Sequence, residues 1–246
     1  MPTTNDGYLI VASRKYSFYA LACNLAEGIK EYYPEAKICI VTEERFCEDG
    51  RAEEIADHLI FCDDNYRAKI WGMAQTPFDR TFYIDADCEC IHEDISTIFD
   101  LLGDNDMMFT GLADEHWYVF NDDPFPGGQF KLCGAVCLYR KTERTIKFLN
   151  DWYKLFNEHR SGRWWPENED GQPDYVNFPK RLRGWDQFSL MWLTDHTDEF
   201  SDLKIEIFED KLKWNYWAIL DPKKDPMPED TVIFHLSCVA PKDLFD

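Results

Sequence analysis

Positive charge is scarce in this sequence. The 246 residues include only 26 Lys and Arg but 47 Asp and Glu, so the formal net charge is −21. Binding to nucleic acid or to an anionic membrane surface needs clustered cations that replace counterions. The charge balance therefore excludes a protein whose main task is to hold such a polyanion, and we expect no nucleic-acid partner.

Long apolar runs are missing as well. No segment approaches the roughly 20 consecutive apolar residues that a helix needs to cross a bilayer. Residues 1–7 are polar and lack the basic region of a secretory signal. We therefore expect no membrane span and a cytoplasmic location.

The cysteines lack the pattern of a disulfide framework. Nine are scattered along the chain, an odd number, and we expect most of them to be small buried thiols. Cys88-x-Cys90 and Cys133-x3-Cys137 lack a second Cys or His pair at zinc-site spacing, which disfavours a zinc site.

Apolar and aromatic residues, by contrast, are plentiful. They make up 45% and 16% of the chain, enough for a substantial core, so disorder is not expected despite the charge. The length allows one large domain or two small ones, and no repeat, low-complexity tract or shift in composition marks a boundary.

Short apolar runs alternate with segments of helical spacing. We predict strands over 8–12, 37–42, 58–61, 80–84, 107–112, 133–139 and 231–234, and helices over 16–33, 52–56, 66–74, 95–102 and 142–159. This alternation is typical of a parallel sheet with helices on both faces, which binds ligands outside the carboxyl ends of its strands. Two long aromatic and proline-rich loops, 114–129 and 161–179, are predicted to be binding loops.

Asp85-Ala86-Asp87 follows the predicted strand 80–84 directly. An Asp-x-Asp pattern alone says little, because 28 Asp residues would give roughly three matches by chance, and 104–106 is another match. The position is informative, since it is the carboxyl end of a strand in an open α/β sheet. Two neighbouring carboxylates repel each other unless a cation lies between them, although a solvated acidic turn remains the alternative.

Five motifs follow one another along the chain: Asn65-Tyr-Arg-Ala-Lys69, Phe78-Asp-Arg-Thr-Phe-Tyr-Ile-Asp-Ala-Asp87, Cys133-Gly-Ala-Val136, Gly184-Trp-Asp-Gln187 and Phe234-His-Leu236. In order and approximate spacing they resemble the glycogenin-like retaining glycosyltransferases, family 8 of the GT-A fold. The resemblance extends from Tyr8 to about Lys242.

The resemblance implies a fold and an activity. The fold is a single α/β, Rossmann-like GT-A domain over 1–246 with a mostly parallel central sheet flanked by helices. Residues 1–112 would form the nucleotide-binding half, and 113–246 the acceptor half with a C-terminal metal-ligand segment. The activity is metal-dependent transfer of a hexose, glucose or galactose, from a UDP-sugar to a carbohydrate or other hydroxyl acceptor, with retention and with slow hydrolysis as a side reaction.

The resemblance also implies a metal site. Asp85 and Asp87 would hold a divalent cation together with His235, which follows the predicted strand 231–234. Oxygen and imidazole ligands suit Mn²⁺, with Mg²⁺ as an alternative. Such a cation would offset the charge that grows on the leaving nucleoside diphosphate.

Contacts to the donor follow from the same resemblance. The implied donor-binding residues are Ala12, Ser13 and Tyr19 for uracil and ribose, Asp85 and Ala86 for the nucleotide, Lys69 and Lys242 for the diphosphate, and Gly134 and Ala135 beside the sugar. Asp186 would accept hydrogen bonds from sugar hydroxyls, and Gln187 would lie near the anomeric carbon. Cys133 replaces the family's usual Asn, Cys238 replaces a Gly, and Lys242 falls one residue late.

Other interpretations stay open at this point. Asp85-x-Asp87 also resembles the first motif of dehalogenase-like phosphatases, but those place it after the first strand rather than the fourth. A nucleotide-sugar-binding module with little turnover is the non-enzymatic alternative. For the acceptor, Trp117, Tyr118 and Phe120 are candidates to stack on sugar rings, and Trp164 and Trp165 are expected to be exposed. The aromatics at 214–217 are expected to pack in the core.

Overall fold

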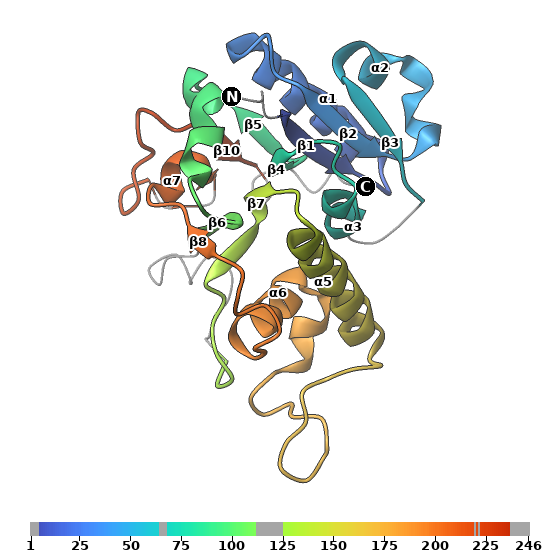
Figure 1. Cartoon of the computed structure of the whole chain (residues 1–246), viewed down its shortest axis with the longest axis vertical. Coiled ribbons are helices and arrows are strands. Elements are labelled where there is room, and N and C mark those ends of the chain that lie inside the picture. The colour runs from blue at the N-terminus through green and yellow to red at the C-terminus, as the bar shows by residue number, and fades with distance from the viewer. Residues whose placement is uncertain (1–4, 64–67, 112–124, 219, 221, 237–246) are drawn as a thin grey trace.

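A seven-stranded sheet forms the centre of the protein in the computed structural model, which describes residues 5–63, 68–111, 125–218, 220 and 222–236 (Figure 1). The strand order is β3-β2-β1-β4-β7-β6-β8. The bounds are β1 Asp6–Ala12, β2 Ile38–Thr42, β3 His58–Phe61, β4 Arg80–Asp85, β6 Met107–Gly111, β7 Leu132–Arg140 and β8 Ile205–Ile207. Four of the six pairs among these described strands are parallel, and β7 runs antiparallel to both of its neighbours.

Helices cover both faces of the sheet. The helices are α1 Tyr16–Tyr32, α2 Arg51–Ile55, α3 Ala68–Ala74, α5 Glu143–Ser161, α6 Asp186–Asp195 and α7 Lys211–Trp214, with 3₁₀ helices η1 Glu44–Asp49, η2 Glu93–Leu102 and η4 Lys180–Gly184. Side chains of β1 point alternately to the two layers of helices. Tyr8 and Ile10 pack in the core with α1 and η2, whereas Leu9 and Val11 pack in the core with α3 and α5. Both faces are therefore dry, which explains why β1 is an uninterrupted apolar run.

A small second sheet completes the carboxyl edge. Its order is β5-β10-β9, with β5 Cys88–Cys90, β9 Tyr216–Trp217 and β10 Ile233–His235. β5 and β10 are antiparallel, and Cys88 lies opposite His235. The chain directly after β4 is thus joined to a segment almost 150 positions later in the sequence.

The predicted fold class is confirmed, while several elements differ in detail. The helix expected over 95–102 is the 3₁₀ helix η2, and the strand expected over 231–234 begins at Ile233. The strands β5, β8 and β9 were not expected, because two or three residues are too few to show alternation. α6 was missed because its buried residues lie on several sides of the helix, so it has no single apolar stripe.

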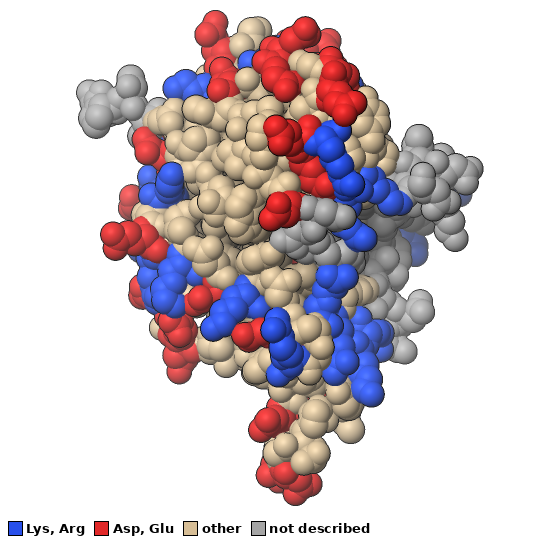
Figure 2. Space-filling model, turned by 90° about the vertical axis from the view of Figure 1, so that its right-hand side faces the viewer, with Lys and Arg blue, Asp and Glu red and all other residues tan. Residues whose placement is uncertain are grey.

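Charge is spread unevenly over the molecule. Residues 140–183 hold ten Lys and Arg against seven Asp and Glu, in contrast to the large acidic excess of the chain. Figure 2 shows Lys and Arg gathered on the lower half of the face that it views, with Asp and Glu at its upper and lower ends. The part of the chain that includes α5 and η4 therefore lacks the general negative excess.

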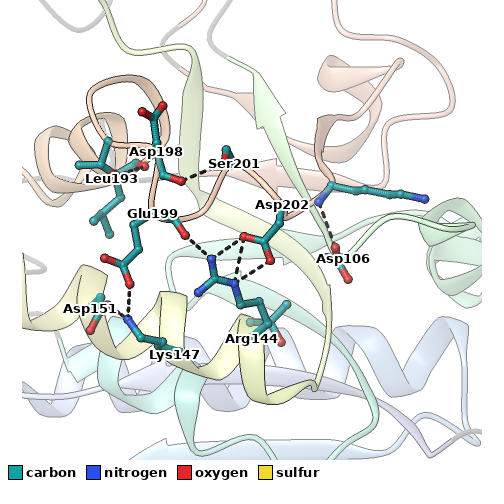
Figure 3. Close-up of polar contacts among 12 residues, drawn as sticks. Asp106, Arg144, Lys147, Asp151, Leu193, Asp198, Glu199, Ser201 and Asp202 are labelled. Carbon is teal, nitrogen blue, oxygen red and sulfur yellow. Dashed lines mark hydrogen bonds and ion pairs between the residues drawn. The ribbon is translucent and has the colours of Figure 1, made fainter.

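A polar network ties α5 to the loop that follows α6 (Figure 3). The Arg144 guanidinium binds both carboxylate oxygens of Asp202, donates to the Glu199 carbonyl and lies 4.6 Å from the Phe200 ring centroid. Lys147 pairs with Glu199 at 2.8 Å and with Asp151 at 2.5 Å. The network closes over Phe200, which packs edge to face on Phe148.

We expect Arg144→Met to lower the free energy of unfolding slightly, and the urea midpoint with it, because it removes a bidentate ion pair and a cation–π contact at a partly exposed site. Urea unfolding measures the change. Lys154→Met, at an exposed position of the same helix, is the control and should change stability little. Equal stability of both variants would contradict a stabilising role for the network.

Candidate functional site

The carboxyl ends of β1 and β4 open into a cavity of about 450 Å³. Eleven of the thirteen site residues predicted from the sequence line it: Ala12, Ser13, Lys69, Asp85, Ala86, Asp87, Gly134, Ala135, Asp186, Gln187 and His235. They come from β1, α3, the β4–β5 turn, β7, α6 and β10. Tertiary structure thus brings together motifs that are up to 220 residues apart in the chain.

The β4–β5 turn explains the position of Asp87. β4 ends at Asp85, and β5 begins at Cys88 and pairs with β10. The pairing sets the Asp87 Oδ1 atom 3.4 Å from His235 Nε2, and the Asp87 carbonyl accepts a hydrogen bond from the Leu236 amide at 2.8 Å. Asp87 and His235 therefore face each other at the edge of the cavity.

Lys69 joins three segments of the site. Its Nζ atom lies 2.8 Å from Asp186 Oδ2, 3.4 Å from each oxygen of Asp85, and donates to the Gly134 carbonyl at 3.3 Å. Its side chain is 12% exposed, so these ion pairs are little screened by solvent. Lys69 holds together two carboxylates that would otherwise repel each other.

The two carboxylates of the Asp-x-Asp motif differ electrostatically. Burial raises the pKa of Asp85, and Lys69 only partly offsets this; the Tyr83 hydroxyl also donates to Asp85. Burial alone would raise the pKa of Asp87 too, but the hydrogen bond with His235 and its charge outweigh it, so the pKa of Asp87 is lowered. Asp87 is the carboxylate better prepared to stay ionised.

The donor atoms at the edge of the cavity could hold a divalent cation. Ligand atoms of Asp87, Cys88 and His235 all lie within 4.8 Å of one another. Within the described part of the chain, Asp85 lies outside this group and pairs with Lys69. Cys88 was expected to be an inert core thiol; it is buried, and burial raises its pKa well above the usual range. A carboxylate, an imidazole and a thiol can together ligate a borderline divalent metal.

Asn215 positions the imidazole of His235, a role that no sequence motif indicated. Its amide nitrogen donates to Thr110 Oγ1 at 3.2 Å and to Cys133 Sγ at 3.7 Å, which directs its Oδ1 atom toward His235 Nδ1 at 3.0 Å. His235 Nδ1 therefore donates to Asn215, which fixes the ring so that Nε2 faces Asp87. Cys133 thus takes part in the site by supporting Asn215.

We expect Asn215→Ala to weaken Mn²⁺ binding about 10–100-fold, because the imidazole loses the partner that fixes its tautomer and orientation. Titration with Mn²⁺, followed by electron paramagnetic resonance, measures the affinity. Asn157→Ala, which removes a hydrogen bond on the outside of α5, is the control. Affinities of the two variants within twofold of each other would contradict the positioning role.

Tyr19 does not reach the cavity, contrary to the prediction. Its side chain is fully buried, and its hydroxyl donates to Asp49 at 2.6 Å and accepts from the Ala52 amide at 3.2 Å. The neighbouring Phe18 lines the cavity instead, because one step along a helix turns the side chain by about 100°. Phe18 is the aromatic residue of α1 available to a ligand.

Arg14 is a further lining residue that the sequence did not reveal. Its φ angle is +75°, an uncommon left-handed conformation for a residue with a side chain. The Glu43 carboxylate accepts a hydrogen bond from its backbone amide and stabilises this conformation. Strained backbone of this kind concentrates at functional sites, and here it places Arg14 in the lining of the cavity.

Gly134 is required by close packing behind the site. A Cβ atom there would lie 3.0 Å from the Trp152 ring, whose indole nitrogen donates to the Asp186 carbonyl at 2.9 Å. Trp152 is fully buried and thereby fixes the start of α6, where Asp186 and Gln187 enter the cavity. The glycine at this position of β7 thus has a structural cause.

The remaining predictions concern the C-terminal lysine and the aromatic residues. Lys242, Cys238, Trp117, Tyr118 and Phe120 lie outside the described residues. Trp165 is 6% exposed, so its expected exposure is wrong, while Trp164 is half-buried. Trp214 and Tyr216 are buried as expected, whereas Trp217 lines the cavity and contacts the His235 ring.

Comparison with solved structures identifies the fold. The galactosyltransferase LgtC, solved with donor and acceptor sugar analogues, is 13% identical, with 94% of this chain and 86% of that chain covered and a TM-score of 0.54. The glycosyltransferase GlyE of Streptococcus pneumoniae TIGR4 is 14% identical at a TM-score of 0.57; 94% of this chain is covered, but it spans only 54% of GlyE. A glycosyltransferase involved in glycosylating the major capsid of PBCV-1 is 11% identical, with 96% and 95% covered and a TM-score of 0.51.

One further structure of LgtC carries an active-site mutation of a glutamine to glutamate. No family model matches the sequence, and no curated protein is similar to it in sequence. In the described residues, no helix is long and apolar enough to span a membrane. The chain has the GT-A type α/β fold of glycosyltransferases.

Proposed function

We propose that the protein is a metal-dependent glycosyltransferase that moves a hexose, glucose or galactose, from a UDP-sugar to a hydroxyl acceptor. The observation that carries the proposal is the cavity at the strand ends. It gathers Asp87 and His235, which face each other, with Lys69, Asp186 and Gln187, in a chain that folds like glycosyltransferases.

The charges lining the cavity support metal dependence. The cavity lining contains three carboxylates, of Asp85, Asp87 and Asp186, and two basic side chains, of Lys69 and Arg14. The excess of negative charge means that the cavity by itself repels an anionic diphosphate. A bound Mn²⁺ or Mg²⁺ would supply the missing positive charge and stabilise the charge that develops on the leaving diphosphate. Asp87 and His235 are the residues that would hold it, with Asp85 as the third ligand.

Small residues leave room for the donor. Ala12, Ser13, Ala86, Gly134 and Ala135 line the cavity without filling it. We place the nucleotide along the first three and the sugar beside the last two. Phe18 takes the base-stacking role first assigned to Tyr19, and Lys69 and Arg14 face the diphosphate, with Lys242 as a further candidate.

Asp186 and Gln187 are the residues proposed to act on the sugar. Asp186, held by Lys69 at 2.8 Å, accepts hydrogen bonds from sugar hydroxyls, and Gln187 lies beside the anomeric carbon. LgtC also has an active-site glutamine, which supports this role. An amide is a weak nucleophile, so we favour front-face retention: the acceptor oxygen bonds to the anomeric carbon, the bond to UDP breaks, and the leaving phosphate oxygen takes the acceptor's proton. Slow hydrolysis follows when water is the acceptor.

Donor turnover tests the proposal. UDP release from UDP-glucose and UDP-galactose is measured with Mn²⁺, with Mg²⁺ and after chelation, alongside UDP binding by calorimetry. We expect release and tight binding only with a divalent cation. Tight UDP-sugar binding in metal-free buffer would contradict the site assignment, and metal-dependent binding without any release would favour the binding module.

A further inference from the structure

A second cavity, of about 500 Å³, lies between the loop 162–175 and the η4–α6 segment. The proposed transfer reaction does not use it. Its lining contains four aromatic side chains: Trp164, Trp165, Tyr175 and Trp192. This volume is in the range of small-molecule sites, so the cavity can take a ligand of one or two sugar units.

The aromatic walls are rigid and partly open. Trp164 and Trp192 pack edge to face, with ring centroids 5.0 Å apart at 72°, and Trp192 stacks on His196 at 4.6 Å. Trp164, Trp192 and Tyr175 are half-buried, so part of each ring remains accessible. A ligand that stacks on rings already held in place loses little side-chain entropy.

Polar groups stand among these rings. The Arg183 guanidinium lies over the rings of Trp165 and Tyr175 at 5.4 and 5.8 Å and donates to the Tyr175 hydroxyl at 2.9 Å. Its Nε atom is buried and has no hydrogen-bond partner in the part of the chain that is described. Glu167 adds a carboxylate to the lining at an exposed position. The cavity thus offers both donors and an acceptor.

Gly162 leaves space for this arrangement. It ends α5 with a φ angle of +75°, and a Cβ atom there would lie 3.2 Å from the Arg183 guanidinium. The end of α5 and the position of Arg183 are therefore coupled, which makes the cavity a fixed part of the fold.

We propose that this cavity binds a neutral hexopyranose. The apolar C–H face of a pyranose matches an aromatic surface, and its hydroxyls can pair with a guanidinium and a carboxylate together. Arg163 also lines the cavity and bonds the Ser161 hydroxyl, but Glu167 opposes an anionic ligand. A hexopyranose uses the rings, the donors and the acceptor at once.

The two cavities share one segment of chain. Arg183 lies three residues before Asp186, and Trp192 lies six residues after it on α6, about 9 Å along the helix axis. The bound sugar is therefore assigned to the acceptor glycan, at a unit remote from the reacting hydroxyl. This last step rests on the proposed function; the binding of the sugar does not.

Direct binding tests the proposal. Methyl α-glucopyranoside, methyl β-galactopyranoside, maltose and lactose are titrated in saturation-transfer NMR and calorimetry without donor. We expect saturable binding with a Kd in about the millimolar range for at least one of them. Trp164→Ala should weaken it at least about tenfold, and Glu167→Gln, at an exposed position that disturbs no packing, should weaken it too. Tyr32→Ala, at an exposed aromatic on α1, is the matched control and should bind like the wild type.

Three results would overturn the proposal: no binding of any glycoside, unchanged affinity in Trp164→Ala and Glu167→Gln, or displacement of the glycoside by UDP with Mn²⁺. Binding of inorganic phosphate in place of the glycosides would identify an anion site and would also overturn it. UDP release is measured on the same preparation. UDP release without glycoside binding would refute only the proposal that the second cavity binds a sugar. Glycoside binding without UDP release would refute only the proposed transferase activity.

Discussion

Asp87→Asn should lower metal-dependent UDP release about 10²–10³-fold. The substitution keeps the size of the side chain but removes the carboxylate that faces His235 at 3.4 Å and whose pKa is lowered in the fold. Without this carboxylate the cation that would stabilise the leaving diphosphate is held less well, and losing one such stabilising group has costs of this size in other enzymes. Release of UDP from UDP-glucose and UDP-galactose at fixed Mn²⁺ measures the effect, and Mn²⁺ affinity provides a second readout.

The chain contains a matched control for this experiment. Asp104 belongs to the other Asp-x-Asp pattern, at an exposed position between η2 and β6. Asp104→Asn removes the same charge from the protein and should leave UDP release and Mn²⁺ affinity unchanged. Because the pKa of Asp87 is lowered in the fold, its charge favours the folded state, so Asp87→Asn should be somewhat less stable than the wild type, and urea unfolding checks that the variant is still folded. Equal activity of the two variants would refute the role of Asp87.

Stability should fall by up to about 3 kcal/mol between pH 6.5 and pH 4 because of one buried histidine. His159 is fully buried, and neither ring nitrogen has a hydrogen-bond partner in the described residues. Burial lowers its pKa from 6.5 to about 4; the charge of Arg183 lowers it further, while Asp186 opposes the shift. The rings of Phe156 and Phe188 meet it edge-on at 5.3 Å.

The sign of the effect follows from proton linkage. Between pH 4 and pH 6.5 the unfolded chain binds a proton at this histidine and the folded chain does not, so stability rises with pH. The contribution of the neutral His159 to the free energy of unfolding is complete above pH 6.5 and is lost as the pH falls toward 4. A shift of about 2.5 pKa units corresponds to about 3 kcal/mol.

Urea unfolding at several pH values between 4 and 7.5 measures this slope. His159→Phe keeps a ring among the aromatic neighbours and removes the titration, so the difference between wild type and variant isolates this histidine from the carboxylates. His58→Gln, at an exposed position on β3, is the control and should follow the wild type. Parallel pH profiles of wild type and His159→Phe would contradict the account.

Local patterns in the sequence were sufficient to predict the fold class and the place of the acidic motif in it. The β1, β2 and β4 strands are continuous apolar runs because both sheet faces are covered, and such runs are visible in a single sequence. The position of Asp85 and Asp87 at a strand end follows from the same pattern. That His235, Asp186 and Gln187 belong to the same site was predicted from the resemblance to a glycosyltransferase family, not from the periodicity of apolar residues.

Other features depend on which way a side chain turns. Phe18 and Tyr19 are adjacent aromatics on α1, and only the placement of α1 against the sheet decides that Phe18 lines the cavity. Trp164 and Trp165 are likewise adjacent, yet one is half-buried and the other is buried under Arg183. Neighbouring residues of one chemical type cannot be told apart without the packing.

The sequence by itself determined the acidic charge, the alternation of strands and helices, and the acidic motif at a strand end, because these depend on residues close together in the chain. Only the tertiary structure decided that Asn215 orients His235, that Cys88 lies beside Asp87 and His235, that Lys69 bridges Asp85 and Asp186, and that a second cavity forms beside Arg183. Each of these needs contacts between residues far apart in sequence. Such contacts exist only once β5 has paired with β10 and α6 has packed on Trp152.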